Sequence, residues 1–455
     1  MLQRLKRFLR RKAPVPAGAP RSIKASRHQL FPSSISPGAR EVVATLTAAG
    51  YQALVVGGCI RDILLGKQVK DFDVATDATP EQVRSLFRRS RIIGRRFRIA
   101  HVHVGRELVE VTTFRAGHDN ASGPGASARP MEHKRSNHRG MLVRDNVFGS
   151  LEEDAQRRDF TINAIYYDLA ADELLDFVGG IEDLTRRTLR VIGDPKTRFR
   201  EDPVRMLRAA RFQAKLGFDL HPVTAEPLAQ LHALLGEVPP ARLFDELLKL
   251  LMNGHALAAY EALAGHHLLE PLLPDTAAAL AADPRWDRFL RQALINTDER
   301  IANQQRVTPA FLFAALLWPP IAAAAARTPT QGAATPSLPQ LASAAIAQAF
   351  RRIAIPRRFS ASAREIWELQ PRLESPSRRT AEQTLEHPRF RAAYDFLLLR
   401  EQSGEELGGV GAWWTRLQDA TVGERQAMLA SLQATSKRAR PRRRRRPAAA
   451  ATAVE

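Results

Sequence analysis

Cysteine is nearly absent from this chain of 455 residues, in which Cys59 is the only example. A single cysteine excludes a framework of disulfides within the chain and fits a reducing compartment, so we expect a cytoplasmic protein. The most apolar stretch, residues 311–326, contains Pro319 and Pro320, which we expect to interrupt it before it reaches the length of a membrane span. We therefore expect no stable membrane insertion and a globular chain of roughly two to four domains.

Acidic residues are missing from the N-terminal end and scarce at the C-terminal end. Residues 1–40 hold ten Lys and Arg and no acid, and residues 437–455 hold eight Lys and Arg and one Glu. The whole chain carries a net charge of +20, which leaves +3 for residues 41–436. Basic ends around a nearly neutral body predict solvated arms that bind a polyanion. A solubility role for the arms, or a mitochondrial presequence at the N-terminus, stays open.

The stretch at residues 54–76, LVVGGCIRDILLGKQVKDFDVAT, predicts a strand, a glycine turn, a short helix and a second strand. Asp71 and Asp73 are two positions apart in the second strand, so their side chains project from the same face. Two neighbouring carboxylates repel each other unless a cation lies between them, and Mg²⁺ suits carboxylate and phosphate oxygens. The plain alternative for such a pair is a solvated strand end.

Two glycines and an arginine accompany these acids. Gly57 and Gly58 allow the backbone to approach a phosphate group closely, and Arg61 is a nearby cation that can hold it. The combination of GG, RD and DxD in one strand–helix–strand unit resembles the catalytic motif of the DNA polymerase β-like nucleotidyltransferase superfamily. Within that superfamily it resembles the branch that contains bacterial poly(A) polymerases and tRNA CCA-adding enzymes.

A second motif is the string RRDFTIN at residues 157–163. Arg157 and Arg158 are adjacent guanidinium groups that can form paired contacts with phosphate. Asp159 can accept a hydrogen bond from a ribose hydroxyl or support a metal site. By itself RRD is an ordinary charged helix start, but the whole string resembles a motif of the same family.

The sequence Glu-Asp-Pro at residues 201–203 predicts a helix start with Asp202 as its N-cap and the proline as its first residue. Arg205, Arg208 and Arg211 follow at intervals of three along one helix face. Arginines arranged in this way often only form salt bridges. Beside a nucleotide site, we expect the array to recognise the edge of a base through hydrogen bonds.

The predicted strand pair at residues 92–104 and 107–114 carries two histidines and an acid of interest. His101 and His103 share one strand face, but no third soft ligand lies nearby, so we interpret them as structural rather than as a zinc site. Glu110 is a candidate third metal carboxylate, and we place Asp159 ahead of it.

Two further features have competing interpretations. Residues 116–139 are rich in Gly, Ser, Pro and His and predict a long loop near the substrate entrance. The adjacent Trp413 and Trp414 can stack on bases, but we favour helix packing for them.

Within the family, three segments resemble poly(A) polymerases more than CCA-adding enzymes. They are residues 92–102 (IIGRRFRIAHV), residues 145–149 (DNVFG) and residues 239–244 (PPARLF), and the Arg-rich end adds to the likeness. The resemblance covers roughly residues 41–436. It implies an α+β protein with an N-terminal polymerase β-like nucleotidyltransferase head, built on a mixed sheet, followed by an all-α neck, body and tail. The implied segments are a basic disordered extension (1–40), the head (41–193), the neck (194–255), the body and RNA-binding domain (256–436) and a disordered Arg-rich tail (437–455).

The resemblance implies template-independent transfer of AMP from ATP to an RNA 3′ hydroxyl with release of pyrophosphate, in RNA polyadenylation and decay. It implies two Mg²⁺ ions held by Asp71 and Asp73, with Asp159 as a third catalytic carboxylate. RNA would bind through the helical domains and the basic tails of a monomer. The residues implied to bind the nucleotide are Gly57, Gly58, Arg61 and Arg158 at the triphosphate and sugar, and Asp202, Arg205, Arg208 and Arg211 at the base.

Two alternatives remain at this level. The first is CCA addition to tRNA, which shares the GG, DxD, RRD and EDxxR motifs. The second is a non-catalytic RNA-binding protein, which the intact Asp71–Asp73 pair argues against because a binding protein does not need two clustered acids.

Overall fold

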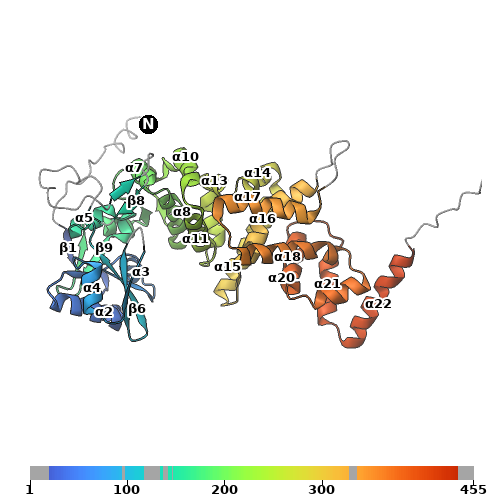
Figure 1. The fold of residues 1–455 in the computed structure, drawn as a ribbon, viewed down its shortest axis with the longest axis horizontal. Helices are drawn as coiled ribbons and strands as arrows, with labels where there is room; N and C mark the ends of the chain where they lie inside the picture. Colours follow the sequence, from blue (N-terminus) through green and yellow to red (C-terminus); the bar gives the residue numbers. More distant parts are fainter. Residues whose placement is uncertain are drawn as a thin grey trace, which may run out of the picture. The chain divides into compact units, whose positions relative to one another are not determined.

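The computed structural model describes residues 20–94, 98–116, 134–136, 142–145, 147–326 and 336–438. The chain divides into two compact units, residues 1–272 and residues 273–455 (Figure 1). Residues 1–19 of the N-terminal extension, most of the predicted 116–139 loop and almost all of the C-terminal tail lie outside the described residues. The finer domain boundaries that we expect from the sequence stay predictions.

The first unit is built on a mixed sheet of eight strands in the order β1-β10-β9-β2-β3-β6-β5-β4. Neighbouring strands are antiparallel except β3 and β6, which run parallel. This arrangement confirms the predicted α+β class with a mixed sheet in the head. The strands are β1 (Arg21–Lys24), β2 (Ala53–Val56), β3 (Phe72–Thr76), β4 (Ser90–Ile93), β5 (Ile99–Val104), β6 (Glu107–Thr113), β9 (Ile165–Asp168) and β10 (Glu173–Asp176).

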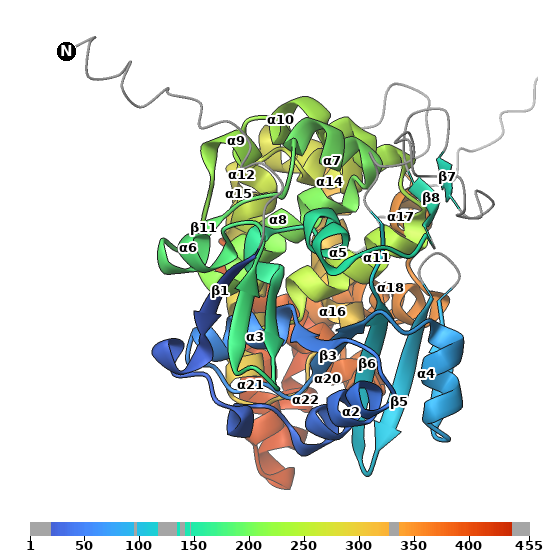
Figure 2. The same ribbon diagram turned by 90° about the vertical axis from the view of Figure 1, so that its left-hand side faces the viewer.

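Helices pack against this sheet and continue beyond it in the first unit (Figure 2). α2 contacts β2, β3, β5 and β6, and α3 contacts β2, β3 and β9, which places α3 beside the central strands. α4 begins with a capping box, in which Thr79 and Gln82 satisfy each other's backbone N–H groups. The helices are α2 (Pro37–Ala48), α3 (Gly58–Leu64), α4 (Pro80–Leu86), α5 (Leu151–Arg157), α6 (Gly180–Thr185), α7 (Pro195–Glu201), α8 (Val204–Leu216), α9 (Pro222–Ala225), α10 (Leu228–Leu231), α11 (Pro240–Leu251), α12 (Ala256–Gly265) and α13 (Leu269–Leu272).

Short elements complete the described part of this unit. They are the 3-10 helices η1 (Ala25–His28), η2 (Pro32–Ser34), η5 (Thr161–Asn163) and η6 (His232–Glu237), and the short strands β7 (Lys134–Ser136), β8 (Leu142–Asp145), β11 (Thr188–Leu189) and β12 (Asp219–Leu220).

The second unit is helical in its described part. Trp414 is fully buried and donates to the Leu373 carbonyl at 2.8 Å, and the ring of Trp413 meets it edge-on with centroids 5.0 Å apart. These contacts support helix packing over base stacking as the use of the tryptophan pair. The helices are α14 (Pro274–Ala282), α15 (Pro284–Ala302), α16 (Pro309–Ala325), α17 (Leu338–Ile353), α18 (Arg357–Glu374), α19 (Arg378–Leu385), α20 (Phe390–Gln402), α21 (Val410–Asp419) and α22 (Val422–Arg438).

Two sequence-based boundaries are wrong. The single strand predicted at residues 92–104 is divided between β4 and β5, because Gly94 takes a left-handed backbone with φ of 86° that ends an extended strand. The prolines expected to interrupt residues 311–326 do not end α16, which continues through Pro319 and Pro320. Most of this helix is buried, and we infer that packing outweighs the lost backbone hydrogen bonds.

Proline and glycine divide the C-terminal half of the chain into separate helices. Pro356 separates α17 from α18, and Gly404, Gly408 and Gly409, all with positive φ, lie between α20 and α21. α22 ends at Arg438, two residues beyond the tail boundary that we predicted. None of the described helices is long and apolar enough to cross a membrane.

Candidate active site

The turn after β2 lies against two charged side chains. Gly57 has φ of 90° and ψ of −137°, a conformation that glycine adopts without steric cost. A Cβ atom at Gly57 would lie 3.5 Å from Nη1 of Arg158 and 3.7 Å from Oδ2 of Asp73. Gly58 then begins α3. The glycine turn therefore faces a guanidinium group and a carboxylate at contact distance.

The two acids lie at the start of β3, as the sequence predicts. Asp71 is exposed immediately before the strand, Asp73 is half-buried within it, and Phe72 between them is buried with 4% exposure. In the sheet register Asp73 lies beside Val56 of β2 and Glu110 of β6. Glu110, which we ranked below Asp159, is therefore the acid that the fold places next to the pair.

Without a bound cation, the surroundings of Asp73 destabilise its ionised carboxylate. Burial and the negative charges of Glu110 and Asp71 together raise the pKa of Asp73 from 3.8 to about 6, against the opposing charge of Arg158. A divalent cation between these carboxylates would offset the repulsion, and oxygen ligands suit Mg²⁺. The donor chemistry therefore fits the metal that the sequence implies.

The neighbouring histidine has a structural partner. His101 of β5 faces Glu110 in the strand register, and its Nε2 lies 3.3 Å from Oε1 of Glu110, although it lacks hydrogen-bond geometry. Within the part of the chain that the structure describes, no group of three or more Asp, Glu, His and Cys side chains is arranged as a metal site. The structural interpretation of His101 stays a prediction, and a metal at this site would depend on the acids Asp71 and Asp73.

Arg158 is fixed by a buried cluster at the end of α5. Its Nε donates to the Tyr166 hydroxyl at 2.9 Å, and its Nη2 donates to Oδ2 of Asp154 at 3.1 Å. The Tyr166 hydroxyl in turn donates to the same Asp154 oxygen at 2.8 Å. Burial acts to raise the pKa of Asp154, but Arg158 and Arg157 outweigh it and the pKa is lowered. Nη1 of Arg158 is the guanidinium nitrogen that faces Gly57.

Asp159 belongs to a different network from the paired acids. Its Oδ2 accepts from Nε of Arg208 at 2.7 Å, and its Oδ1 accepts from the Asn163 amide at 3.1 Å. Burial opposes ionisation, but Arg208 lowers the pKa of Asp159 well below its usual range. The same Asn163 accepts from Nη1 of Arg61 at 2.6 Å through its side-chain oxygen. Asn163 thus connects the GG–RD motif to the RRDFTIN motif.

Arg61 differs from its predicted role. Its side chain is only 3% exposed, and it donates to Asp62 at 2.8 Å as well as to Asn163. Such a buried and engaged guanidinium group positions its neighbours, and it is not free to follow a triphosphate. The expectation that Arg61 itself holds phosphate is therefore weakened.

The three arginines predicted along one face of α8, Arg205, Arg208 and Arg211, are all ion-paired. Arg205 donates to Glu201 at 3.0 Å, and Arg211 donates to the buried Glu246 at 2.5 Å. Asp202 accepts two hydrogen bonds from Arg242, each of 3.1 Å. The prediction of Asp202 as an N-cap is wrong, because α8 begins at Val204 with no side-chain cap and Asp202 ends α7.

Phe212 organises three of these cations. The guanidinium carbons of Arg61, Arg208 and Arg211 lie 5.1, 5.5 and 4.5 Å from the centre of its ring. Cation–π contacts of this kind fix the direction of long side chains. The interpretation of a rigid arginine array on α8 is therefore supported, although its contact with a base is untested.

Sequence reasoning missed the partners that hold this site. Arg198 of α7 is buried and donates to the Arg158 carbonyl at 2.6 Å, which joins the neck to the RRD segment. Asp154 was detectable, since it precedes Arg158 by four residues in a helix. The other missed partners are Asn163, Tyr166, Arg242 and Glu246. Asn163 lies in the string RRDFTIN and Arg242 in the string PPARLF, but neither residue was given a role in the sequence analysis.

Comparisons with known proteins agree with this geometry. The family model described as Poly A polymerase head domain matches residues 53–190. A second model, described as Probable RNA and SrmB-binding site of polymerase A, matches residues 217–280. A third, described as Polymerase A arginine-rich C-terminus, matches residues 331–448. A solved tRNA nucleotidyltransferase in complex with a primer tRNA and an incoming ATP analog is similar in fold, with a TM-score of 0.56, 23% identity, and coverage of 83% of this chain and 98% of that chain.

Full-length relatives separate the two enzyme classes. The chain is 46% identical to Poly(A) polymerase I of Salmonella typhimurium over 93% of this chain and 92% of that protein. It is 39% identical to the CCA-adding enzyme of Bacillus subtilis, but over only 51% of this chain and 54% of that protein. The motifs, the head fold and these likenesses converge: the chain belongs to the bacterial poly(A) polymerase family and is a polynucleotide adenylyltransferase that extends RNA 3′ ends with AMP without a template.

Proposed function

We propose that Asp71 and Asp73 hold two Mg²⁺ ions in this enzyme, with Glu110 as the neighbouring third carboxylate. The observation that supports this most is the pKa of Asp73, raised to about 6 by burial and by the adjacent acids. When bound, Mg²⁺ supplies Lewis-acid activation of the attacking hydroxyl and neutralises phosphate charge. Glu110 takes the place that we first gave to Asp159, because Asp159 is engaged by Arg208.

The triphosphate would lie against the glycine turn. Gly57 and Gly58 carry no side chain that would hold a phosphate away from the backbone, and Nη1 of Arg158 faces Gly57. Arg158 remains positively charged there because Asp154 and Tyr166 hold it in place. Arg61 acts indirectly, by orienting Asn163 and through it Asp159.

The adenine would be recognised where α7 ends and α8 begins. Asp202, Arg205, Arg208 and Arg211 are each held by a charged partner, so their remaining donors and acceptors have fixed directions. A rigid array of this kind discriminates bases because a mismatched base leaves buried polar groups unpaired. ATP selection is therefore assigned to the neck.

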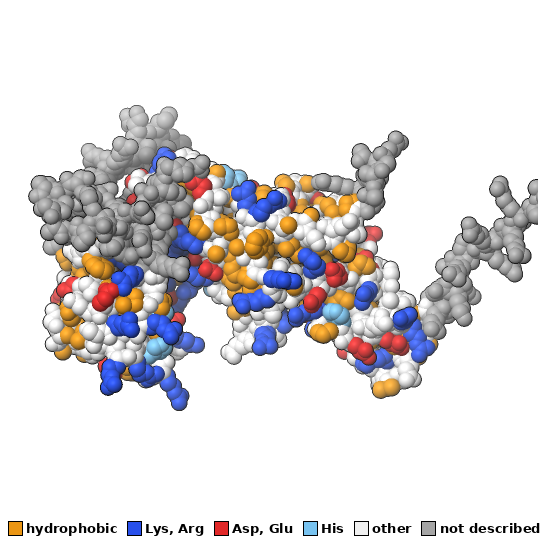
Figure 3. Space-filling model, viewed as in Figure 1, with side chains coloured by type: hydrophobic (Ala, Val, Ile, Leu, Met, Phe, Trp, Pro, Cys, Tyr) orange, Lys and Arg blue, Asp and Glu red, His pale blue; other side chains and the backbone are white. Residues whose placement is uncertain are grey.

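RNA is the proposed macromolecular partner of a monomeric enzyme in the cytoplasm. The head, the neck and the helical body with its C-terminal domain are the proposed divisions of residues 41–436. Lys and Arg side chains are spread over both units in Figure 3, which suits contacts with a polyanion beyond the catalytic centre.

A nucleotide panel tests this proposal. Purified protein is incubated with an RNA of generic 3′ sequence and each nucleoside triphosphate separately, with Mg²⁺ or with EDTA. We expect extension with ATP alone, and only when Mg²⁺ is present. Extension that persists in EDTA would contradict the metal proposal, and equal use of the four nucleotides would contradict base selection at the neck.

A further inference from the structure

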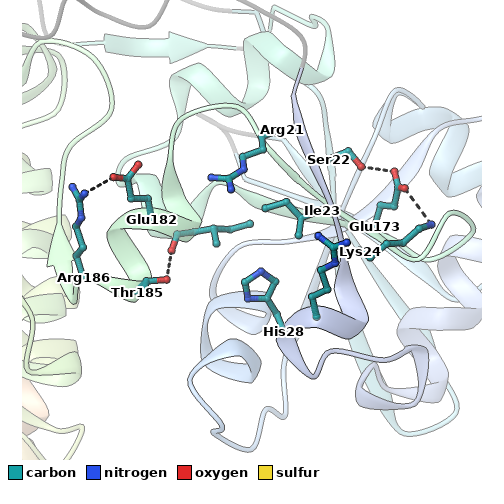
Figure 4. A pocket seen from close by; sticks show the side chains of 11 residues that line it. Arg21, Ser22, Ile23, Lys24, His28, Glu173, Glu182, Thr185 and Arg186 are labelled. Carbon is teal, nitrogen blue, oxygen red and sulfur yellow. Dashed lines mark hydrogen bonds and ion pairs between the residues drawn. The ribbon is translucent and has the colours of Figure 1, made fainter.

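A concave pocket of about 680 Å³ lies where β1, η1 and α6 meet, at the edge of the sheet (Figure 4). β1 is the outermost strand, four positions from β3 in the sheet order. At the usual strand spacing these four steps cover roughly 19 Å. The pocket is therefore separate from the acids at the start of β3, and its volume is in the range of ligand sites.

The two acids of this pocket are already neutralised. Nζ of Lys24 lies 3.2 Å from Oε1 of Glu173, and Ser22 also donates to Glu173. Nη2 of Arg186 lies 2.7 Å from Oε1 of Glu182. These acids consequently leave the remaining cations of the pocket uncompensated.

Arg21, Arg27 and His28 supply the remaining donors. Among the described residues, the structure gives none of these three side chains a hydrogen-bond or ion-pair partner, and both arginines are exposed. In Figure 4, Arg21 and His28 extend on the side of α6, whereas Ser22 and Lys24 turn toward Glu173. Uncompensated guanidinium groups in a concave surface are well suited to paired contacts with phosphate oxygens.

Backbone hydrogen bonds hold the segment that carries these cations in the folded head. β1 pairs with β10 along its whole length, from Arg21 opposite Asp176 to Lys24 opposite Glu173. Ala25 at the start of η1 is fully buried, and its N–H donates to the Asp172 carbonyl at 3.1 Å. The basic charge here is thus part of the folded head, in contrast to a solvated arm.

We propose that this β1–α6 pocket binds phosphodiester groups of the RNA substrate, as a contact on the head that is additional to the helical domains and the tail. Arg21 and Arg27 would each contact a phosphate without reading sequence. The sequence favours RNA as the source of the phosphates, because residues 1–19, which lead into β1, hold six Lys and Arg and no acid. The proposal rests on RNA being the substrate of this enzyme.

The test uses the full-length chain with Arg21→Ala and Arg27→Ala combined. Affinity for a labelled oligoadenylate is measured at several salt concentrations, together with the Km for ATP. Loss of two phosphate contacts should weaken RNA binding about 3- to 10-fold at low salt and reduce the salt slope by about 1.4. The Km for ATP and turnover at saturating RNA should stay unchanged, since the catalytic acids are untouched.

A matched control removes equal charge elsewhere on the head. Arg84→Ala with Arg106→Ala changes two exposed arginines on α4 and at the β5–β6 turn. Equal weakening by both pairs would show a general charge effect and overturn the proposal, as would an unchanged affinity and salt slope in the pocket variant. A changed Km for ATP would indicate a nucleotide site instead. If wild-type protein bound RNA but did not extend it, the catalytic proposal would fail while the pocket remained testable by binding.

Discussion

Asp73 on β3 and Glu110 on β6 are direct neighbours across the parallel strand pair of the head. After burial, the charge of Glu110 is the largest influence that raises the pKa of Asp73. The fold keeps these two acids together at an electrostatic cost that a bound cation offsets. This relationship argues against the solvated strand end that the DxD spacing alone left open.

The first prediction concerns stability without metal. Because the pKa of Asp73 rises from 3.8 to about 6 on folding, the folded protein binds more protons than the unfolded chain between these pH values. The free energy of unfolding should therefore fall as the pH rises through this window. In EDTA at about pH 7.5, Asp73→Asn should be more stable than wild type by about 1–3 kcal/mol, measured by urea unfolding.

Its control is Asp71→Asn, which changes the exposed acid of the same pair and should alter stability by less than about 0.5 kcal/mol. Added Mg²⁺ should stabilise wild type more than the Asp73 variant. A variant less stable than wild type at both acidic and neutral pH would show that the burial of Asp73 is not costly.

The second prediction concerns the hydroxyl of Tyr166, which joins Arg158 to Asp154. Tyr166→Phe should raise the Km for ATP about 3- to 10-fold, because Arg158 loses a partner that directs it toward the glycine turn. Its cost in stability should be about 1 kcal/mol. Steady-state kinetics at saturating RNA separate Km from kcat.

The adjacent Tyr167 provides the matched control. Its hydroxyl donates to Asp172 at 2.7 Å, away from Arg158. Tyr167→Phe should leave the Km for ATP unchanged. Equal effects of the two variants would mean that the Tyr166 hydroxyl has only a structural role.

Contacts between residues that are close in the sequence can be predicted from it, whereas contacts between distant residues cannot. The capping box at Thr79 and the shared face of Asp71 and Asp73 follow from short spacings, so the sequence predicts them. The ion pair of Asp202 with Arg242 joins residues 40 positions apart, and that of Asp159 with Arg208 joins residues 49 apart. No spacing rule encodes such partners, because they depend on how helices pack in three dimensions.

The third prediction concerns base selection. Arg205→Ala should reduce the preference for ATP over the other nucleotides by about 10-fold or more, because the remaining polar groups of the neck lose a fixed neighbour. Arg200→Ala is the control, since Arg200 is exposed on α7. Incorporation of each nucleotide is measured for both variants. Unchanged preference in Arg205→Ala would move recognition to another part of the protein.

The fourth prediction concerns the C-terminal arm. Truncation after Arg438 keeps α22 and removes six arginines between residues 440 and 446. RNA binding should weaken, its salt slope should fall by up to about 4, and the products should be shorter. Turnover at saturating RNA should be similar to that of wild type. The same affinity and salt slope in the truncated protein would leave the arm without a role in RNA binding.

The most direct test of the account is to measure AMP incorporation and RNA affinity together for Asp71→Ala and Asp73→Ala. If these acids hold the catalytic metals, each variant should retain less than a few per cent of wild-type activity at any Mg²⁺ concentration, while its RNA affinity stays within about 2-fold of wild type. Retention of substantial AMP incorporation by either variant would contradict the central assignment of the metal site to these two acids.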